Sequence, residues 1–207
     1  MTQPTARRDL AWQASLFGGA EASFDVEFST VQRLDLDATA WVDHAPGWVA
    51  GGDTLFETLL TAAPWEEHKV WMYERKVEQP RLTARWDERP AMLDDMRTAL
   101  SGWYGVEFTS VGFNLYRDGR DSVAWHGDRV ARELPEAIVA IVSLGGRRRF
   151  QLRPKGGGLS TTIWVASGDV LVMGGSCQRT WDHSVPKMRT AEPRISVTFR
   201  HAYDGRG

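Results

Sequence analysis

The sequence predicts a mainly β protein of the α+β class, with a jelly-roll core and supporting helices near the N-terminus. Two observations lead to this prediction. Apolar residues recur at helical spacing only in the first half, whereas from Phe108 onward short alternating segments follow one another. Turns that contain glycine separate these segments. Helices first and roughly eight short strands afterwards are typical of a jelly roll with helical support.

Two helices and one strand are predicted in the first half. Residues 31–36 alternate between apolar and polar side chains, as an edge strand does. Thr54 and Glu57 have the spacing of a capping box for the first helix, which Pro64 ends, and Pro90 opens the second helix. The apolar faces carry Leu55, Phe56, Leu59 and Leu60 in the first helix and Leu93, Met96, Leu100 and Trp103 in the second.

The second half is predicted to consist of short strands. They lie near residues 108–117, 121–126, 137–144, 148–153, 161–165, 169–173, 179–184 and 194–201. We expect residues 1–22 to form a flexible N-terminal arm and residues 23–207 to form a single domain, because 207 residues suffice for one sizeable core.

The composition excludes several classes of protein. With 25 Lys and Arg against 27 Asp and Glu, the net charge is −2, so any contact with nucleic acid must use a local basic patch. The single cysteine, Cys177, cannot form an internal disulfide and fits a reducing compartment. Neither a signal peptide nor an apolar run of the roughly eighteen residues that span a bilayer is evident. We therefore expect a cytoplasmic monomer without membrane contact.

Two histidines and one aspartate form a candidate metal site. His126 and Asp128 are two residues apart at the end of a predicted strand, so their side chains can face the same side. His183 belongs to a distant strand that a jelly roll can bring opposite them. Two imidazoles and one carboxylate are the facial triad that holds non-haem Fe(II) and leaves positions open for substrate and oxygen. A His-x-Asp sequence is nevertheless common in proteins that hold no metal there.

Arg194 and Arg200 lie on the polar face of the last predicted strand, whose other face is apolar. On an outer strand this polar face would meet water. In a barrel interior, two buried cations would need anions to compensate them. A bound dicarboxylate and the carboxylate of the metal site would supply these anions, because an arginine binds a carboxylate through two parallel hydrogen bonds.

Asn114 and Tyr116 place an amide and a phenol on one face of the strand predicted at 108–117. Both groups can hydrogen-bond to a carboxylate. They are equally consistent with an ordinary polar strand surface.

These residues and their neighbours resemble the AlkB-type Fe(II)/2-oxoglutarate dioxygenases, which demethylate nucleic acid. The resemblance extends over roughly residues 65–202, in the family's order and spacing. It is carried by NLYRDGRDSVAWHGD at 114–128, SLGGRRRFQLR at 143–153, GDVLVMGG and WDHSVPK before residue 188, and PRISVTFR at 193–200. It implies a double-stranded β-helix, with a substrate lid and supporting helix at about 65–105 and the jelly-roll core at about 108–202.

The resemblance also implies the roles of the site residues. His126, Asp128 and His183 would bind Fe(II). Arg194 would pair with the distal carboxylate of 2-oxoglutarate, and Arg200 would lie near the carboxylate beside the keto group. Asn114 and Tyr116 would hydrogen-bond to the same co-substrate, and oxygen would be the second co-substrate.

For the substrate, the resemblance implies alkylated DNA, with RNA as an alternative, presented single-stranded or as a flipped base. Bases of the 1-methyladenine and 3-methylcytosine type would be demethylated while 2-oxoglutarate is decarboxylated, which releases formaldehyde and succinate. Methylation leaves such a base cationic, so an aromatic wall would attract it.

Residues 75–86 align loosely with the family's substrate lid. His126 would form one aromatic wall; the candidates for the other are Trp86 first, then Trp71 and Tyr73. These three aromatics would alternatively pack a helix against the sheet. The candidates for phosphate contact are two basic clusters: Arg75, Lys76, Arg81 and Arg85 in the lid, and Arg147, Arg148, Arg149, Arg153 and Lys155 on one hairpin. Such charge runs can also be ordinary solvated surface.

Two alternatives to a DNA demethylase remain at this stage. One is an oxygenase of the same fold that acts on RNA, a small molecule or a protein side chain, and Arg129 and Val130 leave it open because many family members have an acidic residue there. The other is a non-catalytic jelly-roll module that holds a metal. An inward-facing arginine pair argues against this module, because holding a metal requires no cations.

Overall fold

The computed structural model describes residues 10, 20–72, 75–128, 134 and 136–201, and for residues 69–72 and 75–78 it describes the backbone alone. Of the predicted N-terminal arm, only Leu10 and residues 20–22 are described, so the arm otherwise lies outside the described residues. No helix among the described residues has the length and apolar character needed to span a membrane.

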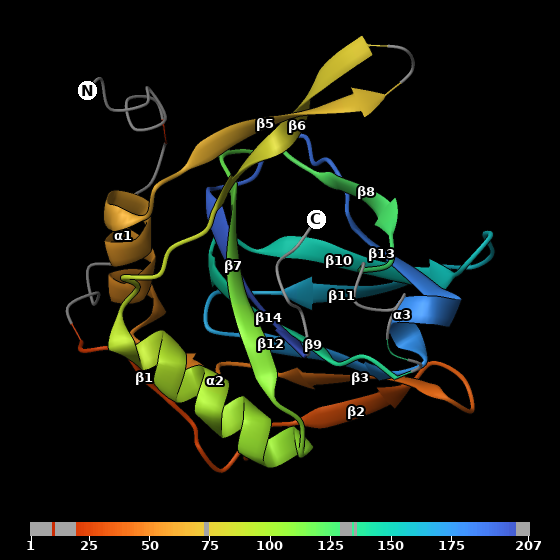
Figure 1. The fold of residues 1–207 in the computed structure, drawn as a ribbon, viewed down its shortest axis with the longest axis horizontal. Coiled ribbons are helices and arrows are strands. Elements are labelled where there is room, and N and C mark those ends of the chain that lie inside the picture. Colours follow the sequence, from red (N-terminus) through yellow and green to blue (C-terminus); the bar gives the residue numbers. More distant parts are fainter. Residues whose placement is uncertain (1–9, 11–19, 73–74, 129–133, 135, 202–207) are drawn as a thin grey trace.

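Two antiparallel sheets form the core and face each other (Figure 1). The large sheet contains, in spatial order, β2 (Gln32–Asp35), β3 (Ala40–Ala45), β12 (Val170–Gly175), β9 (Val139–Gly145), β14 (Arg194–His201), β7 (Phe108–Tyr116), β6 (Arg75–Ala84) and β5 (Glu66–Met72). The small sheet contains β11 (Thr161–Val165), β10 (Arg148–Pro154), β13 (Trp181–Val185) and β8 (Val123–His126). A further pair, β1 (Ser23–Phe24) and β4 (Val49–Ala50), lies beside the large sheet. This arrangement confirms the predicted jelly roll.

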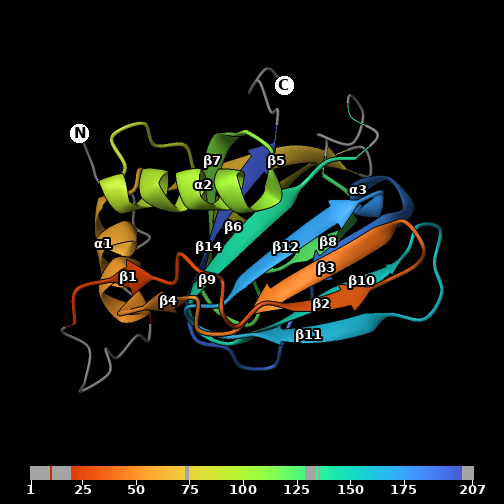
Figure 2. The same cartoon turned by 90° about the horizontal axis from the view of Figure 1, so that it is seen from below.

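Helices α1 (Gly52–Ala62) and α2 (Ala91–Tyr104) cover the outer side of the large sheet (Figure 2). The chain therefore has two cores. The first lies between these helices and the sheet, and the second lies between the two sheets. β9 contributes to both because its side chains alternate: Ala140, Val142 and Leu144 join the first core, and Val139 and Ile141 join the second.

The position of β14 in the large sheet determines where its polar face points. It lies between β9 and β7 in the middle of the large sheet. Its apolar residues, Ile195, Val197 and Phe199, are buried in the first core. On the other face, Arg194, Ser196 and Thr198 are also buried, between the two sheets, and Arg200 is partly buried. The polar face therefore points into the barrel and not to water.

The predicted capping box of the first helix is wrong. α1 begins two residues before Thr54, after Gly51, which has the left-handed conformation (φ 65°), and no side chain caps the helix. The Thr54 hydroxyl instead donates a hydrogen bond to the Ala20 carbonyl at 3.0 Å. The helix ends at Ala62, as Pro64 predicted.

The second helix begins after Pro90 as predicted, but Trp103 does not share its buried face. Leu93, Met96 and Leu100 are buried, whereas Trp103 is 51% exposed and stacks on Phe28 with 4.7 Å between ring centroids. The sequence pattern also missed the hairpin of β5 and β6, in which Pro80 and many charged residues hide the alternation.

Gly174 is required where β12 passes β3. It lies opposite Trp41, and a Cβ on Gly174 would overlap the indole ring.

We expect Gly174→Ala to lower the free energy of unfolding by about 2–3 kcal/mol, because overpacking forces a large ring to move. Gly102→Ala is the matched control. Gly102 lies within α2 and has open space where a methyl group would be added, so alanine there should raise stability by about 0.5–1 kcal/mol. Urea denaturation measures both changes, and equal effects would contradict the steric explanation.

Candidate metal centre and adjoining pocket

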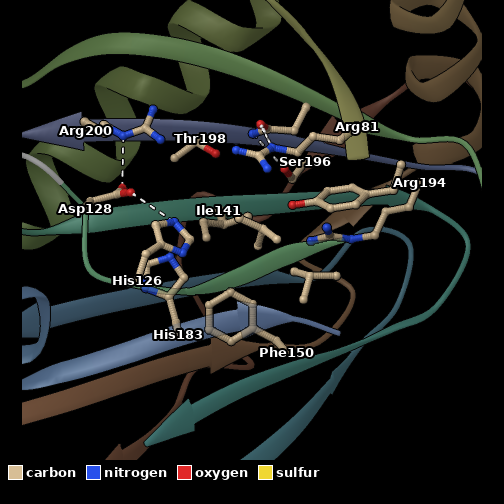
Figure 3. A pocket seen from close by; sticks show the side chains of 14 residues that line it. Arg81, His126, Asp128, Ile141, Phe150, His183, Arg194, Ser196, Thr198 and Arg200 are labelled. Carbon is tan, nitrogen blue, oxygen red and sulfur yellow. Dashed lines mark hydrogen bonds and ion pairs between the residues drawn. The ribbon is translucent and has the colours of Figure 1, made fainter. Parts of the chain in front are cut away.

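His126, Asp128 and His183 converge on one point between the sheets (Figure 3). Their candidate ligand atoms all lie within 4.8 Å of one another. β8 and β13 are paired so that His126 lies directly opposite His183, with 4.3 Å between ring centroids. Nδ1 of His126 is 2.8 Å from the Ala124 carbonyl oxygen, which leaves Nε2 facing the centre, 3.8 Å from Oδ1 of Asp128.

Neighbouring groups fix this geometry. The ring of Phe150 stacks on that of His183, with centroids 5.4 Å apart and an angle of 14°. The backbone N–H of Asp128 donates to Oε1 of Gln178 at 2.9 Å, and Gln178 is buried in the short helix α3 (Cys177–Thr180). At Gly127, a Cβ would come within 2.5 Å of the Gln178 carbonyl oxygen, so this turn requires glycine. The sequence did not mark Phe150 or Gln178, because neither residue type signals a metal site.

The protonation states of His183 and Asp128 suit a divalent metal. Burial, reinforced by His126, lowers the pKa of His183 to about 3, so this imidazole is neutral at pH 7. Burial alone would raise the pKa of Asp128, but Arg200 and the two histidines outweigh it and hold that pKa below its ordinary value. A neutral imidazole and an ionised carboxylate are the forms that bind metals. The donor set fits Fe(II).

Arg200 forms an ion pair with the metal-site carboxylate. Its Nε donates to Oδ2 of Asp128 at 3.0 Å. Gly112, on the pocket-facing side of β7, makes room for this arrangement: among the described residues, a Cβ there would meet only Nη1 of Arg200, at 3.3 Å. The contact of Arg200 with a co-substrate carboxylate stays a prediction.

A second cation, Arg194, lies at the other end of the pocket (Figure 3). It is 1% exposed, its Nη2 donates to Oγ of Ser143 at 2.7 Å, and its Cζ is 5.3 Å from the Tyr116 ring centroid. Burial lowers its pKa to about 10, so it remains protonated at pH 7. Its Nε has no hydrogen-bond partner in the described part of the chain. An unsatisfied buried cation is costly, so this position fits the carboxylate of a ligand.

Asn114 lies between the two arginines and is already held by two neighbours. Its Oδ1 accepts a hydrogen bond from Nε of Arg81 at 3.0 Å, and its Nδ2 donates to Oγ of Ser196 at 3.3 Å. Arg81 comes from β6 and lines the pocket. The sequence placed it among basic residues of the lid, and no spacing signal marked it as a pocket residue. The empty space of the pocket is about 430 Å³.

The remaining substrate-binding predictions have mixed outcomes. Trp86 packs against the first core, 6.4 Å from the ring of Phe113, so the packing alternative describes its position and it does not line the pocket. Arg149 lies on the small sheet, where its Nη2 donates to the Lys187 carbonyl at 3.2 Å. Tyr73 lies outside the described residues, as do the side chains of Trp71, Arg75 and Lys76. Arg129 and Val130, where many family members have an acidic residue, also lie outside them.

Arg148 is not available for the phosphate contact that the sequence suggested. It is fully buried and donates to three backbone carbonyls, those of Asp118 (3.0 Å), Asp121 (2.7 Å) and Pro186 (3.2 Å). It therefore joins the segment before β8 to the segment after β13.

Comparison with known proteins gives consistent results. A family described as the 2OG-Fe(II) oxygenase superfamily matches residues 49–200. The alpha-ketoglutarate-dependent dioxygenase alkB homolog 3 of Bos taurus is 33% identical over 190 residues, and that of Homo sapiens is 32% identical; each match covers 78% of this chain and 66% of the relative. The DNA oxidative demethylase ALKBH2 of Arabidopsis thaliana is 29% identical, covering 71% of this chain and 61% of the relative. This chain thus spans just under two thirds of the length of these relatives.

A solved structure supports the fold. An oxidoreductase of the 2OG-Fe(II) oxygenase family from Burkholderia pseudomallei superimposes with a TM-score of 0.52 at 14% identity. The superposition covers 85% of this chain and 87% of that one.

The lowered pKa of His183 predicts acid sensitivity of the metal-free protein. An unfolded His183 takes up a proton near its ordinary pKa of 6.5, whereas the folded one stays neutral down to about 3. The unfolded state therefore binds more protons in this interval, and stability falls as the pH falls. We expect a loss of about 2 kcal/mol between pH 7 and pH 5 from this group.

The measurement is urea denaturation at the two pH values. His183→Gln should lose about 2 kcal/mol less than the parent over this interval, because it has no imidazole to titrate. His68→Gln, at an exposed position outside the site, should behave as the parent. An identical pH dependence in the His183 variant would contradict the prediction.

Proposed function

The chain belongs to the 2OG-Fe(II) oxygenase superfamily and is an AlkB-type member of it, and from this premise we propose that it demethylates alkylated bases of nucleic acid. The proposed substrates are 1-methyladenine and 3-methylcytosine in DNA. The proposed products are the repaired base, formaldehyde and, from 2-oxoglutarate, succinate and carbon dioxide. The observation that carries the proposal is a buried cation without a carboxylate partner among the described residues, Arg194, in the same pocket as the His126–Asp128–His183 centre.

Bound Fe(II) and 2-oxoglutarate would supply the oxidation of the methyl group by molecular oxygen. The chain supplies their positions. His126, Asp128 and His183 would hold Fe(II) with three ligand atoms, and such a triad would leave positions for co-substrate and oxygen. Arg194 would bind the distal carboxylate of 2-oxoglutarate, and Asn114 and Tyr116 would hydrogen-bond to it. Arg200 keeps the Asp128 carboxylate ionised and fixes its orientation.

The nucleic-acid substrate is inferred from the relatives, one of which is named a DNA oxidative demethylase. A base within a duplex cannot reach a centre between two sheets, so it would enter single-stranded or flipped. The side chain of His126 is 37% exposed and would form one wall against the base. The cytoplasmic location and the monomeric state belong to the same proposal.

Formaldehyde release from a methylated oligonucleotide tests the proposal. In the presence of iron and 2-oxoglutarate, the parent should release formaldehyde, and His126→Ala or Asp128→Ala should abolish the release because the metal loses a ligand. Asp95→Ala, at an exposed position of α2, is the matched control and should retain full turnover. Circular dichroism would verify the fold of each variant. Unchanged turnover in either site variant would refute the ligand assignment.

The role of Arg194 has a separate test. Arg194→Ala should raise the 2-oxoglutarate concentration for half-maximal turnover by about a hundredfold, because a buried charge-assisted pair would be lost. Arg120→Ala, at an exposed turn, should leave that concentration unchanged. A normal 2-oxoglutarate requirement in the Arg194 variant would show that the co-substrate is anchored elsewhere.

A further inference from the structure

The outer face of the small sheet carries arginines at alternate positions. Along β10, Arg149, Gln151 and Arg153 point away from the interior, and Arg147 precedes them in the same alternation. The intervening side chains, Arg148, Phe150 and Leu152, are buried. From residue 147 to residue 153 the strand extends about 20 Å. The outward guanidiniums thus form a row along one strand.

Two tryptophans lie at the ends of this row. On β11, Trp164 is opposite Arg149 and is 41% exposed, and Cζ of Arg147 lies 4.9 Å from its ring centroid. At the other end, Cζ of Arg153 lies 4.2 Å from the ring centroid of Trp125 on β8. Cation–π contacts of this kind hold a guanidinium in place while its charge remains unneutralised. We call this surface the arginine–tryptophan face: Trp125, Arg147, Arg149, Arg153 and Trp164.

One carboxylate lies near this face, and no described carboxylate forms an ion pair with its arginines. Elsewhere in the described chain, arginines commonly pair with an aspartate or glutamate, as Arg33, Arg89, Arg97, Arg117, Arg120 and Arg200 do. The three arginines of the face form no such ion pair within the described residues, although Asp182 lies opposite Arg153 in the strand register. Such a surface attracts an anionic partner.

The combination of residue types identifies the partner's chemistry. Arginines neutralise phosphates, and both indole rings and guanidinium planes stack on unpaired bases. Cations beside accessible aromatic rings are how single-stranded nucleic acid is held without sequence readout. The alternative, an ordinary solvated run of charges, does not account for the partly exposed Trp164 beside the arginines.

The face also lies next to the catalytic site along the chain. Trp125 and His126 are consecutive residues of β8, the edge strand of the small sheet, and their side chains point to opposite sides of it. A strand that passes around this edge would connect the face to the pocket. We propose that the arginine–tryptophan face is a second, non-catalytic contact surface for the single-stranded nucleic acid whose base enters the pocket, an inference that rests on the proposed function.

Binding of an unmodified single-stranded DNA of about 15 nucleotides tests this proposal. The full chain is titrated without iron or 2-oxoglutarate, and fluorescence anisotropy gives the Kd at several salt concentrations. In the triple variant Arg147→Gln, Arg149→Gln, Arg153→Gln, the slope of log K against log salt should become shallower by about 2, since each phosphate contact on a single strand contributes about 0.7. Trp164→Ala should weaken binding about tenfold through lost stacking.

Two positions on α2, which covers the outer side of the large sheet, provide matched controls. Trp103→Ala and Arg97→Gln remove the same residue types from this helix, and both should bind DNA as the parent does. Thermal melting would verify that each variant is folded. An unchanged salt slope in the triple variant, or equal weakening by Trp103→Ala and Trp164→Ala, would overturn the proposal.

The DNA-binding test of the face and the formaldehyde-release test of the proposed function can fail independently. The binding assay contains no alkylated base and no turnover, so it reports on the face alone. Normal DNA binding with no formaldehyde release from any methylated oligonucleotide would refute the demethylase and leave the face in place. Formaldehyde release with unchanged binding in the face variants would refute the face and leave the demethylase in place.

Discussion

The site depends on the burial of a polar strand face. β14 runs through the middle of the large sheet, and its apolar side faces the helices, so its arginine-bearing side can only face the second sheet. Charged groups in such a place are unfavourable unless anions accompany them. At the Arg200 end, the anion is Asp128. At the Arg194 end, the described residues provide two hydroxyls, those of Ser143 and Tyr116, but no carboxylate in ion-pair contact, and this unbalanced charge would suit an acidic ligand.

The metal centre follows from strand pairing in the opposite sheet. β8 and β13 place the two imidazoles on neighbouring strands in direct register, and the carboxylate follows one glycine later. Burial keeps His183 neutral, while Arg200 keeps Asp128 ionised. The same closed environment therefore prepares two different ligands in their metal-binding forms. On an open surface His183 would lose the cause of its shift, because burial is what lowers its pKa.

The sequence predicted these features unevenly, for physical reasons. Strict alternation along residues 194–200 predicted β14, and the separation of His126 and Asp128 by one residue predicted their shared side. Alternation could not decide whether the polar face met water or the interior, because that depends on which strands lie beside it. Arg81, Phe150 and Gln178 were missed because their roles come from contacts between elements distant in the chain. For Trp86 the sequence left a base contact and core packing open, because an aromatic residue near a binding segment suits both; the structure shows the packing, and the base contact stays a prediction.

The consecutive arginines Arg147, Arg148 and Arg149, where β10 begins, have different structural roles although their charges are the same. Arg148 is buried and donates hydrogen bonds to backbone carbonyls, whereas Arg147 and Arg149 are at least partly exposed to solvent. Arg148 joins the approach to β8 to the exit from β13, and these are the strands that carry the two imidazoles. Arg148 thus supports the spacing of the metal ligands through backbone carbonyls, in addition to the direct pairing of the two strands. A lysine in that place would preserve the net charge and still weaken this link, because an ammonium lacks the planar fork that spans three carbonyls.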